Sequence, residues 1–286
     1  DLGMFDKIVS VIGSGTMGNG IAHVFAMSSE VQKVFLVDLD DKILERAQFI
    51  IRKNLDRQVK KDIISDADSN QFYNKIIFTT DIEKASSSNL VVEAVKENLD
   101  IKKNIFSKLD IITSDDTILA TNTSSISINE IATATDSPQN VIGMHFMNPV
   151  PVMKLVEIIK GEKTNNSIVK RTLDYVSSLN KIAVECNDSP GFVSNRILMP
   201  MINEAAFTYM EGVATVDAID QIMKLGMGHP MGPLKLADLI GIDVCVSIMN
   251  VLFEGFRTEK YQVCPLLETM IKEGKLGFKT KQGFYK

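Results

Sequence analysis

Short apolar runs alternate with longer amphipathic stretches over the first two thirds of the chain. The runs are rich in β-branched residues and have the length of buried strands, while the stretches repeat apolar residues with the period of a helix. Such alternation predicts a parallel, doubly wound sheet with right-handed crossovers. The expected strands are 7–12, 34–37, 76–79, 90–94, 117–120, 141–144, 154–159 and 181–185. The expected helices between them include a segment that follows Gly18 and ends near Met27, and the segments 99–112 and 166–179.

The longest amphipathic stretch of this part runs from Asp41 to about Ile64. It is longer than a typical crossover helix, and the polar segment 62–70 follows it. We therefore expect a helical hairpin that extends from the sheet domain.

The pattern changes at residues 187–191, where β-branched runs give way to helical periodicity and frequent methionine. The helices expected beyond this point are 192–210, 216–225, 233–253 and 264–273. The fold class that follows is α/β, with a doubly wound sheet domain over residues 1–187 and an all-helical domain over residues 188–286.

Composition narrows the class of protein. A net charge of −5 over 286 residues gives no basic surface for nucleic acid. Three cysteines and three histidines are scattered, without the spacing of a disulfide framework or a metal site. No apolar run approaches the length of a membrane span, and the N-terminus lacks a signal-peptide pattern. We expect a cytoplasmic enzyme that binds no metal, nucleic acid or membrane.

A glycine-rich loop, Gly13-Ser-Gly-Thr-Met-Gly18, lies between the first expected strand and the helix after it. In such a loop Gly13 makes the tight turn, Gly15 lets the backbone approach phosphates, and Gly18 lets helix and strand pack closely. Thr16 and Met17 lie within the loop as further candidate cofactor-binding residues, and the N-terminal amides of the helix that follows favour an anion. The loop predicts a Rossmann-type dinucleotide site.

Asp38 ends the second expected strand, twenty residues after Gly18. A carboxylate there would accept hydrogen bonds from a ribose diol and would repel a 2′-phosphate. The residue therefore favours NAD over NADP as the cofactor.

His145 follows an expected sheet strand, where residues line the ligand crevice of such folds. Its pKa range suits a base that removes a hydroxyl proton. Glu157 lies twelve residues later in an otherwise apolar run, so a buried carboxylate there would need a partner. Each residue alone also fits a structural role, in the core or on an edge strand. Together, behind a nucleotide motif, they favour a catalytic pair.

Two polar segments complete the candidate site. Residues 120–125 follow an expected strand end, and residues 191–196 open the helical domain, which would present Asn195. Hydroxyl and amide groups there can polarise a carbonyl oxygen, although turn formation and helix capping explain such residues equally well.

Long motifs in these segments, in the same order, make the chain resemble one family, the 3-hydroxyacyl-CoA dehydrogenases, and most of all the bacterial 3-hydroxybutyryl-CoA dehydrogenases. The resemblance covers nearly the whole chain. The motifs that carry it are 11–18, 91–98, 121–125, 145–157, 190–196, 223–226 and 229–233.

The resemblance implies oxidation of an L-3-hydroxyacyl-CoA to the 3-ketoacyl-CoA by NAD, or the reverse reduction, in a protein that dimerises through its helical domain. It also implies a set of site residues. These are His145 as base with Glu157 as its partner, Ser124 and Asn195 at the substrate oxygens, Glu97, Lys102, Asn122 and Asn148 at the cofactor, and Asn54 and Lys61 at CoA. The family commonly has a serine at the position of Asn54.

Two other functions remain open at this point. One is a related dehydrogenase of free hydroxy acids, which would not need Lys61 or the hairpin that carries it. The other is a retired enzyme that binds NAD or has a structural role, against which the intact polar set argues. The sequence fixes neither the direction of the reaction nor the acyl chain length, because one methylene in an apolar pocket is worth only about 1–3 kcal/mol.

Overall fold

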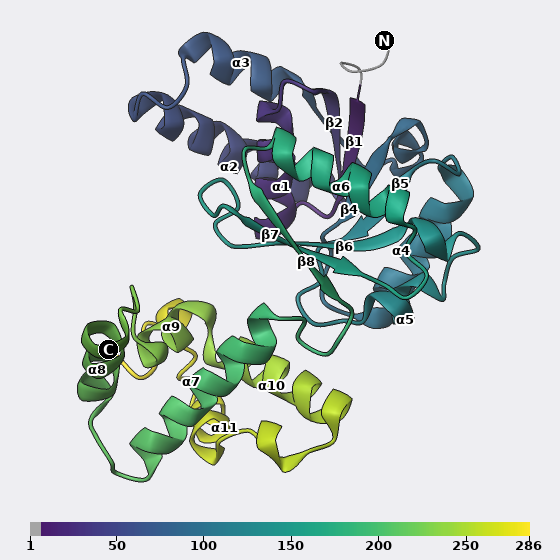
Figure 1. Cartoon of the computed structure of the whole chain (residues 1–286). Helices are drawn as coiled ribbons and strands as arrows, with labels where there is room; N and C mark the ends of the chain where they lie inside the picture. The colour runs from purple at the N-terminus through teal and green to yellow at the C-terminus, as the bar shows by residue number, and fades with distance from the viewer. Residues whose placement is uncertain (1–6) are drawn as a thin grey trace. The chain divides into compact units, whose positions relative to one another are not determined.

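The computed structural model describes residues 7–286, and the chain divides into two compact units (Figure 1). The first unit ends at Asp188 and the second runs from Ser189 to Lys286. The division falls one residue after the domain boundary expected from the pattern. Each unit has its own hydrophobic core.

The first unit is an eight-stranded sheet in the order β3-β2-β1-β4-β5-β6-β7-β8. Its first six strands have the order of a dinucleotide-binding sheet, with the direction of winding reversing between β1 and β4. The strands are β1 Lys7–Ile12, β2 Val31–Val37, β3 Ile76–Thr79, β4 Leu90–Glu93, β5 Ile118–Thr121, β6 Val141–Phe146, β7 Leu155–Lys160 and β8 Ile182–Asn187.

One strand pair differs from the all-parallel sheet that the pattern predicts. β7 runs antiparallel to β6, whereas the other neighbouring strands are parallel. The connection between them holds only residues 147–154, and a parallel crossover needs about a dozen or more residues. The short connection therefore turns the chain back and makes β7 antiparallel.

Helices and short 3₁₀ turns join the strands. The strands β4, β5 and β6 are buried throughout, as expected for a sheet covered on both faces. The helices of this unit are α1 Thr16–Met27, α2 Asp41–Lys60, α3 Asp66–Asn74, α4 Leu99–Ile112, α5 Ile128–Ala132 and α6 Asn166–Ser178, and the 3₁₀ turns are Ile82–Ser87 and Pro138–Asn140.

The expected helical hairpin is present as α2 and α3 (Figure 1). The side chain of Asp40 accepts from the amide of Lys42 at the start of α2, and α2 ends at Lys60, somewhat earlier than the pattern suggested. A reciprocal capping box between Ser65 and Asp68 then starts α3, so part of the expected tip is helical.

The second unit consists of helices and one short isolated bridge among its described residues. Its core joins α7, α10 and α11. The helices are α7 Ser194–Met210, α8 Val216–Met227, α9 Pro233–Ile240, α10 Ile242–Phe256 and α11 Pro265–Lys272, with 3₁₀ turns at Glu259–Tyr261 and Phe278–Thr280.

The single helix expected over residues 233–253 is wrong, because Gly241 separates α9 from α10 with a bend of 99°. Gly241 has φ of +105°, a conformation that side chains strongly disfavour. No single helix among residues 7–286 is both long and apolar enough to cross a membrane; α9 and α10 taken together reach that length and composition, across this bend.

Two buried carboxylates fix the end of the chain to this unit. Asp238 accepts from the amides of Phe284 and Tyr285, each at 2.8 Å. Asp220 accepts from the Tyr285 hydroxyl at 2.7 Å and from the amide of Leu234 in the first turn of α9 at 2.8 Å. The C-terminal segment is therefore part of the folded unit.

Candidate active site

The glycine loop packs against its own backbone. A Cβ atom on Gly18 would lie 1.8 Å from the carbonyl oxygen of Gly13, so only glycine fits there. Gly13 has φ of +98° and lies against Ala94, at the end of β4. A Cβ atom on Gly15 would meet nothing within 4 Å. The loop is thus tightly closed on its protein side and open at Gly15.

No described side chain caps the first backbone amides of α1, the helix that starts at this loop. Gly15 is its N-cap and provides no side-chain acceptor, and the first turn of α1 holds no acidic residue. Helices α2, α3 and α4, in contrast, are each capped by a side chain and carry an acid in the first turn. The start of α1 therefore has the features of an anion site.

Asp38 connects the loop to the end of β2. One of its carboxylate oxygens accepts from both the amide and the hydroxyl of Ser14, each at 2.7 Å, and the other accepts from the amide of Leu39 at 2.7 Å. The carboxylate is half-buried beside the open side of the loop. An open loop, an uncapped helix start and a fixed carboxylate fit the diphosphate and ribose of a dinucleotide.

His145 and Glu157 are brought together by the antiparallel pair β6 and β7. The two residues face each other in the strand register, and Nδ1 of His145 lies 2.9 Å from Oε1 of Glu157. Both are buried, with 7% and 4% of their surface exposed. Because a carboxylate accepts hydrogen bonds, Nδ1 is the donor, and in the neutral imidazole Nε2 is therefore the ring atom with the lone pair.

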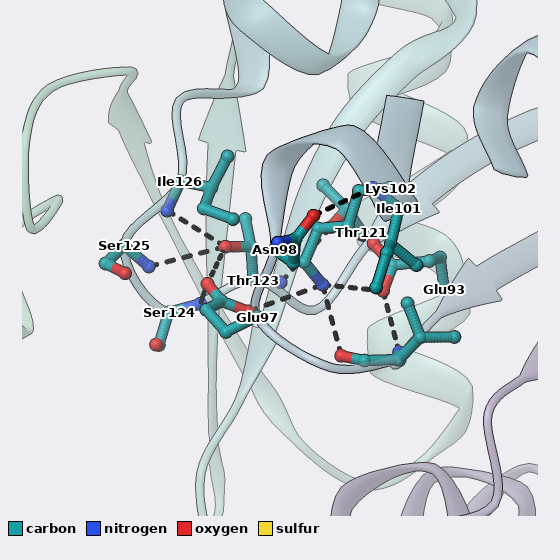
Figure 2. Close-up of polar contacts among 11 residues, drawn as sticks. Glu93, Glu97, Asn98, Ile101, Lys102, Thr121, Thr123, Ser124, Ser125 and Ile126 are labelled. Carbon is teal, nitrogen blue, oxygen red and sulfur yellow. Dashed lines mark hydrogen bonds and ion pairs between the residues drawn. The ribbon is translucent and has the colours of Figure 1, made fainter. Parts of the chain in front are cut away.

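A buried ion pair lies between β4 and α4 (Figure 2). Nζ of Lys102 is 2.6 Å from Oε2 of Glu93, and both side chains are almost fully buried. The hydroxyl of Thr121 and the amide of Val95 also donate to the Glu93 carboxylate. Burial raises the pKa of Glu93, and the ammonium of Lys102 with these donors opposes that rise.

Glu97 extends this pair to the loop after β5. Its Oε2 lies 3.3 Å from Nζ of Lys102, and its Oε1 accepts from the hydroxyl of Thr123 and, at 3.1 Å, from the amide of Ser124. Figure 2 shows Glu97 reaching from the start of α4 to this loop. We call Glu93, Glu97, Lys102, Thr121 and Thr123 the Glu93 cluster; it connects the ends of β4 and β5 at the backbone of Ser124.

Asn122 joins the same strand ends to the His145 strand. Its Oδ1 accepts from the amide of Phe146 at 2.9 Å, one residue after His145. Asn148 is exposed in the connection that follows β6. The structure therefore gathers most of the predicted cofactor and catalytic residues of the first unit at the ends of β1, β2 and β4–β6.

Three predicted residues lie elsewhere. Asn54 is half-buried on α2, and Lys61 is exposed at the C-cap of the same helix. Asn195 is buried in the first turn of α7, in the second unit, so its predicted place beside Ser124 stays a prediction.

Sequence reasoning missed Glu93, and it included Thr121 and Thr123 only as members of the polar segment 120–125, without a carboxylate partner. Glu93 carries the signal that identified Glu157, a lone carboxylate in an apolar strand, and could have been found by it. The two threonines give no comparable signal, because hydroxyl residues are common at strand ends and turns.

Two family models match the chain: the 3-hydroxyacyl-CoA dehydrogenase NAD binding domain over residues 8–189, and the 3-hydroxyacyl-CoA dehydrogenase C-terminal domain over residues 191–286. The cofactor of the first unit is accordingly NAD, which agrees with the geometry of the glycine loop and Asp38.

Several relatives are similar over nearly their full length. A probable 3-hydroxybutyryl-CoA dehydrogenase of Deinococcus radiodurans is 49% identical, over 96% of this chain and 98% of that protein. A 3-hydroxybutyryl-CoA dehydrogenase of Clostridioides difficile is 47% identical, over 97% and 98%. The crystal structure of (S)-3-hydroxybutyryl-CoA dehydrogenase from Ralstonia eutropha superimposes with a TM-score of 0.94 at 41% identity, covering 98% of each chain. With both family domains matched in order, the chain belongs to the 3-hydroxyacyl-CoA dehydrogenase family of NAD-dependent oxidoreductases.

Proposed function

We propose that this enzyme interconverts L-3-hydroxyacyl-CoA and 3-ketoacyl-CoA esters, with 3-hydroxybutyryl-CoA and acetoacetyl-CoA as the preferred pair. The observation that carries the proposal is the buried His145–Glu157 pair beside the strand ends that hold the glycine loop. The names of the most similar relatives support the choice of substrate.

In the oxidation, Nε2 of His145 accepts the proton of the C3 hydroxyl. The imidazole then becomes a cation in a buried position, where an unpaired charge is costly. Glu157, at 2.9 Å from Nδ1, offsets that charge and fixes the orientation of the ring. In the reduction, the same imidazolium returns the proton to the C3 oxygen.

Ser124 and Asn195 hold the C3 oxygen by hydrogen bonds that strengthen as charge develops on it. The Glu93 cluster positions the first of these, because Glu97 accepts from the amide of Ser124. Glu97, Asn122 and Asn148 line the nicotinamide side, and the buried Lys102 positions Glu97 through their 3.3 Å contact. When bound, NAD supplies the hydride acceptor, held by the glycine loop and Asp38.

The two units divide these tasks. Residues 1–187 bind NAD and carry the proton-transfer pair, and residues 188–286 supply Asn195. On the hairpin, Asn54 and Lys61 contact the CoA portion of the substrate.

The decisive experiment follows the loss of NADH absorbance with acetoacetyl-CoA, free acetoacetate and, as a cofactor control, NADPH. Rapid turnover with the CoA ester and NADH alone is the expected result. Turnover of the free acid would replace the proposal by a dehydrogenase of free hydroxy acids. No turnover of either substrate would leave an NAD-binding protein without this activity.

The second unit also supports a homodimer. Three apolar residues of α8, Ile222, Leu225 and Met227, are 60%, 83% and 64% exposed. An apolar cavity of about 350 Å³ lies beside them between α7 and α8, lined in part by Met201 and Met223. Light scattering on the purified enzyme is expected to give twice the chain mass, and Leu225→Glu is expected to shift the mass toward a monomer.

A further inference from the structure

A cavity of about 290 Å³ lies in the first unit, away from the glycine loop. The C-terminal end of α1, the hairpin, the connection between β6 and β7, and the turn between α6 and β8 form its walls. Its lining residues are Val24, Met27, Ser28, Gln58, Ile63, Pro151, Val152, Lys154, Ser178, Leu179, Asn180 and Lys181.

The charged residues that line this cavity are all positive. Lys154 and Lys181 both line it, and no carboxylate is among the lining residues. Within residues 7–286, neither lysine has an ion-pair partner. Burial, together with the positive charge of Lys154, lowers the pKa of Lys181 to about 8. Two cations without a counter-charge in a half-buried hollow are the arrangement of an anion site.

Lys181 also holds the wall of the cavity in place. Its Nζ donates to the carbonyl oxygens of Val150 and Met153, at 2.6 and 2.5 Å. Both acceptors lie in the connection that joins the strand of His145 to the strand of Glu157. An anion bound here would therefore be next to the segment that leads directly into the proton-transfer pair.

At the wall formed by α1 and the hairpin, a buried histidine holds the side chain of Gln58 in place. His23 of α1 is 1% exposed, and its Nε2 lies 2.9 Å from Oε1 of Gln58. Burial lowers the pKa of His23, and its Nε2 donates to the amide oxygen of Gln58. Gln58 is one helical turn from Asn54 and nearly one from Lys61, so the three side chains share a face of α2.

We propose that this cavity binds a phosphate group of the acyl-CoA substrate, with Lys154 and Lys181 as the cations and Gln58 as a hydrogen-bonding partner. The inference rests on the proposed function and adds a phosphate site that the family motifs do not assign. At about 290 Å³ the cavity is at the lower limit of small-molecule pockets, about 300–1,000 Å³, so it takes a part of CoA rather than the whole.

The first test compares KM values for Lys154→Gln. The Lys154 side chain is exposed and takes part in no hydrogen bond or ion pair with residues 7–286, so the fold should be unaffected. We expect KM for acetoacetyl-CoA to rise about 5-fold with kcat unchanged, as for loss of one partly solvated ionic contact. KM for the N-acetylcysteamine thioester of acetoacetate, which has no phosphate, should not change.

A control variant and a second CoA ester make this test more specific. Lys170→Gln, which removes an exposed charge of α6 that does not line the cavity, should leave both KM values unchanged. The ester of dephospho-CoA identifies the phosphate: a rise that persists with it assigns the diphosphate, and a rise that disappears assigns the 3′-phosphate. An unchanged KM for acetoacetyl-CoA, or an equal rise for the phosphate-free thioester, would overturn the inference.

The second test does not depend on turnover. Acetic anhydride at a pH near 8 should modify Lys181 of the wild-type enzyme, and saturating CoA should protect Lys154 and Lys181 but not Lys170, as read by peptide mass spectrometry. Absence of protection at both cavity lysines overturns the site. If acetoacetyl-CoA is not turned over but CoA still protects, the proposed function fails and the phosphate site stands.

Discussion

The glycine loop and the Glu93 cluster lie at neighbouring strand ends but are built in opposite ways. The loop is shaped by missing side chains: Gly18 touches Gly13, and Gly15 leaves open space. The cluster is shaped by buried charges from separate elements, above all Glu93 and Lys102 at 2.6 Å. The loop is formed by residues close along the chain and buries no charge. The cluster is formed by residues far apart along the chain, and burying its ions lowers the stability of the fold unless every charge has a partner.

Breaking the cluster should have the largest effect. Lys102→Met leaves the Glu93 carboxylate buried without its cation, which typically lowers the free energy of unfolding by about 3–5 kcal/mol. Chemical denaturation measures this loss. Lys103→Met, which removes only the half-exposed contact to Glu130, should cost about 0–1 kcal/mol. Equal effects of the two substitutions would show that the pair is not buried in solution.

The proton-transfer pair should be the most sensitive point for activity. His145→Gln and Glu157→Gln are each expected to lower kcat by about 100-fold or more, because one removes the base and the other its charge partner. Steady-state kinetics measure this, with circular dichroism as the check on the fold. Glu162→Gln, on an exposed carboxylate after β7, is the matched control. Near-normal turnover in both variants would contradict the assignment.

The loop offers a comparison between two of its glycines, Gly15 and Gly18. Gly18→Ala places a methyl group 1.8 Å from a backbone oxygen, and overpacking of this kind costs roughly 1–3 kcal/mol. Gly15→Ala meets no protein atom, so it should leave the melting temperature unchanged while raising KM for NADH. The same loss of stability in both variants would mean that Gly15 is structural rather than kept for a phosphate.

The smallest expected effect concerns cofactor choice. Asp38→Ala removes the carboxylate that would bind the ribose diol and would repel a 2′-phosphate, so the preference for NADH over NADPH should fall by about 10-fold, since hydrogen bonds to charged groups are worth about 1.5–3 kcal/mol. The ratio of kcat/KM values measures it, with the exposed Asp41→Ala as control. An unchanged ratio would remove Asp38 from cofactor selection.

The sequence by itself determined the features that depend on residues close together along the chain. A glycine loop between a strand and a helix, and the carboxylate after the next strand, can be read directly because their residues are close along the chain. Strand and helix periods likewise predicted the sheet, the hairpin and the helical second part. The sequence also named His145 and Glu157 as candidates, because a histidine after a strand and a carboxylate in an apolar run occur together behind a nucleotide motif.

Only the tertiary structure decided how distant residues meet. The turn from β6 to β7 sets the register that places His145 opposite Glu157. The short connection excludes a parallel crossover, but the pattern of residues does not give the register. The bend at Gly241 and the threonines around Glu93 depend on neighbours far along the chain. The physical reason is that a buried charge is stable only where partners from other elements arrive together, and the folded arrangement determines whether they do.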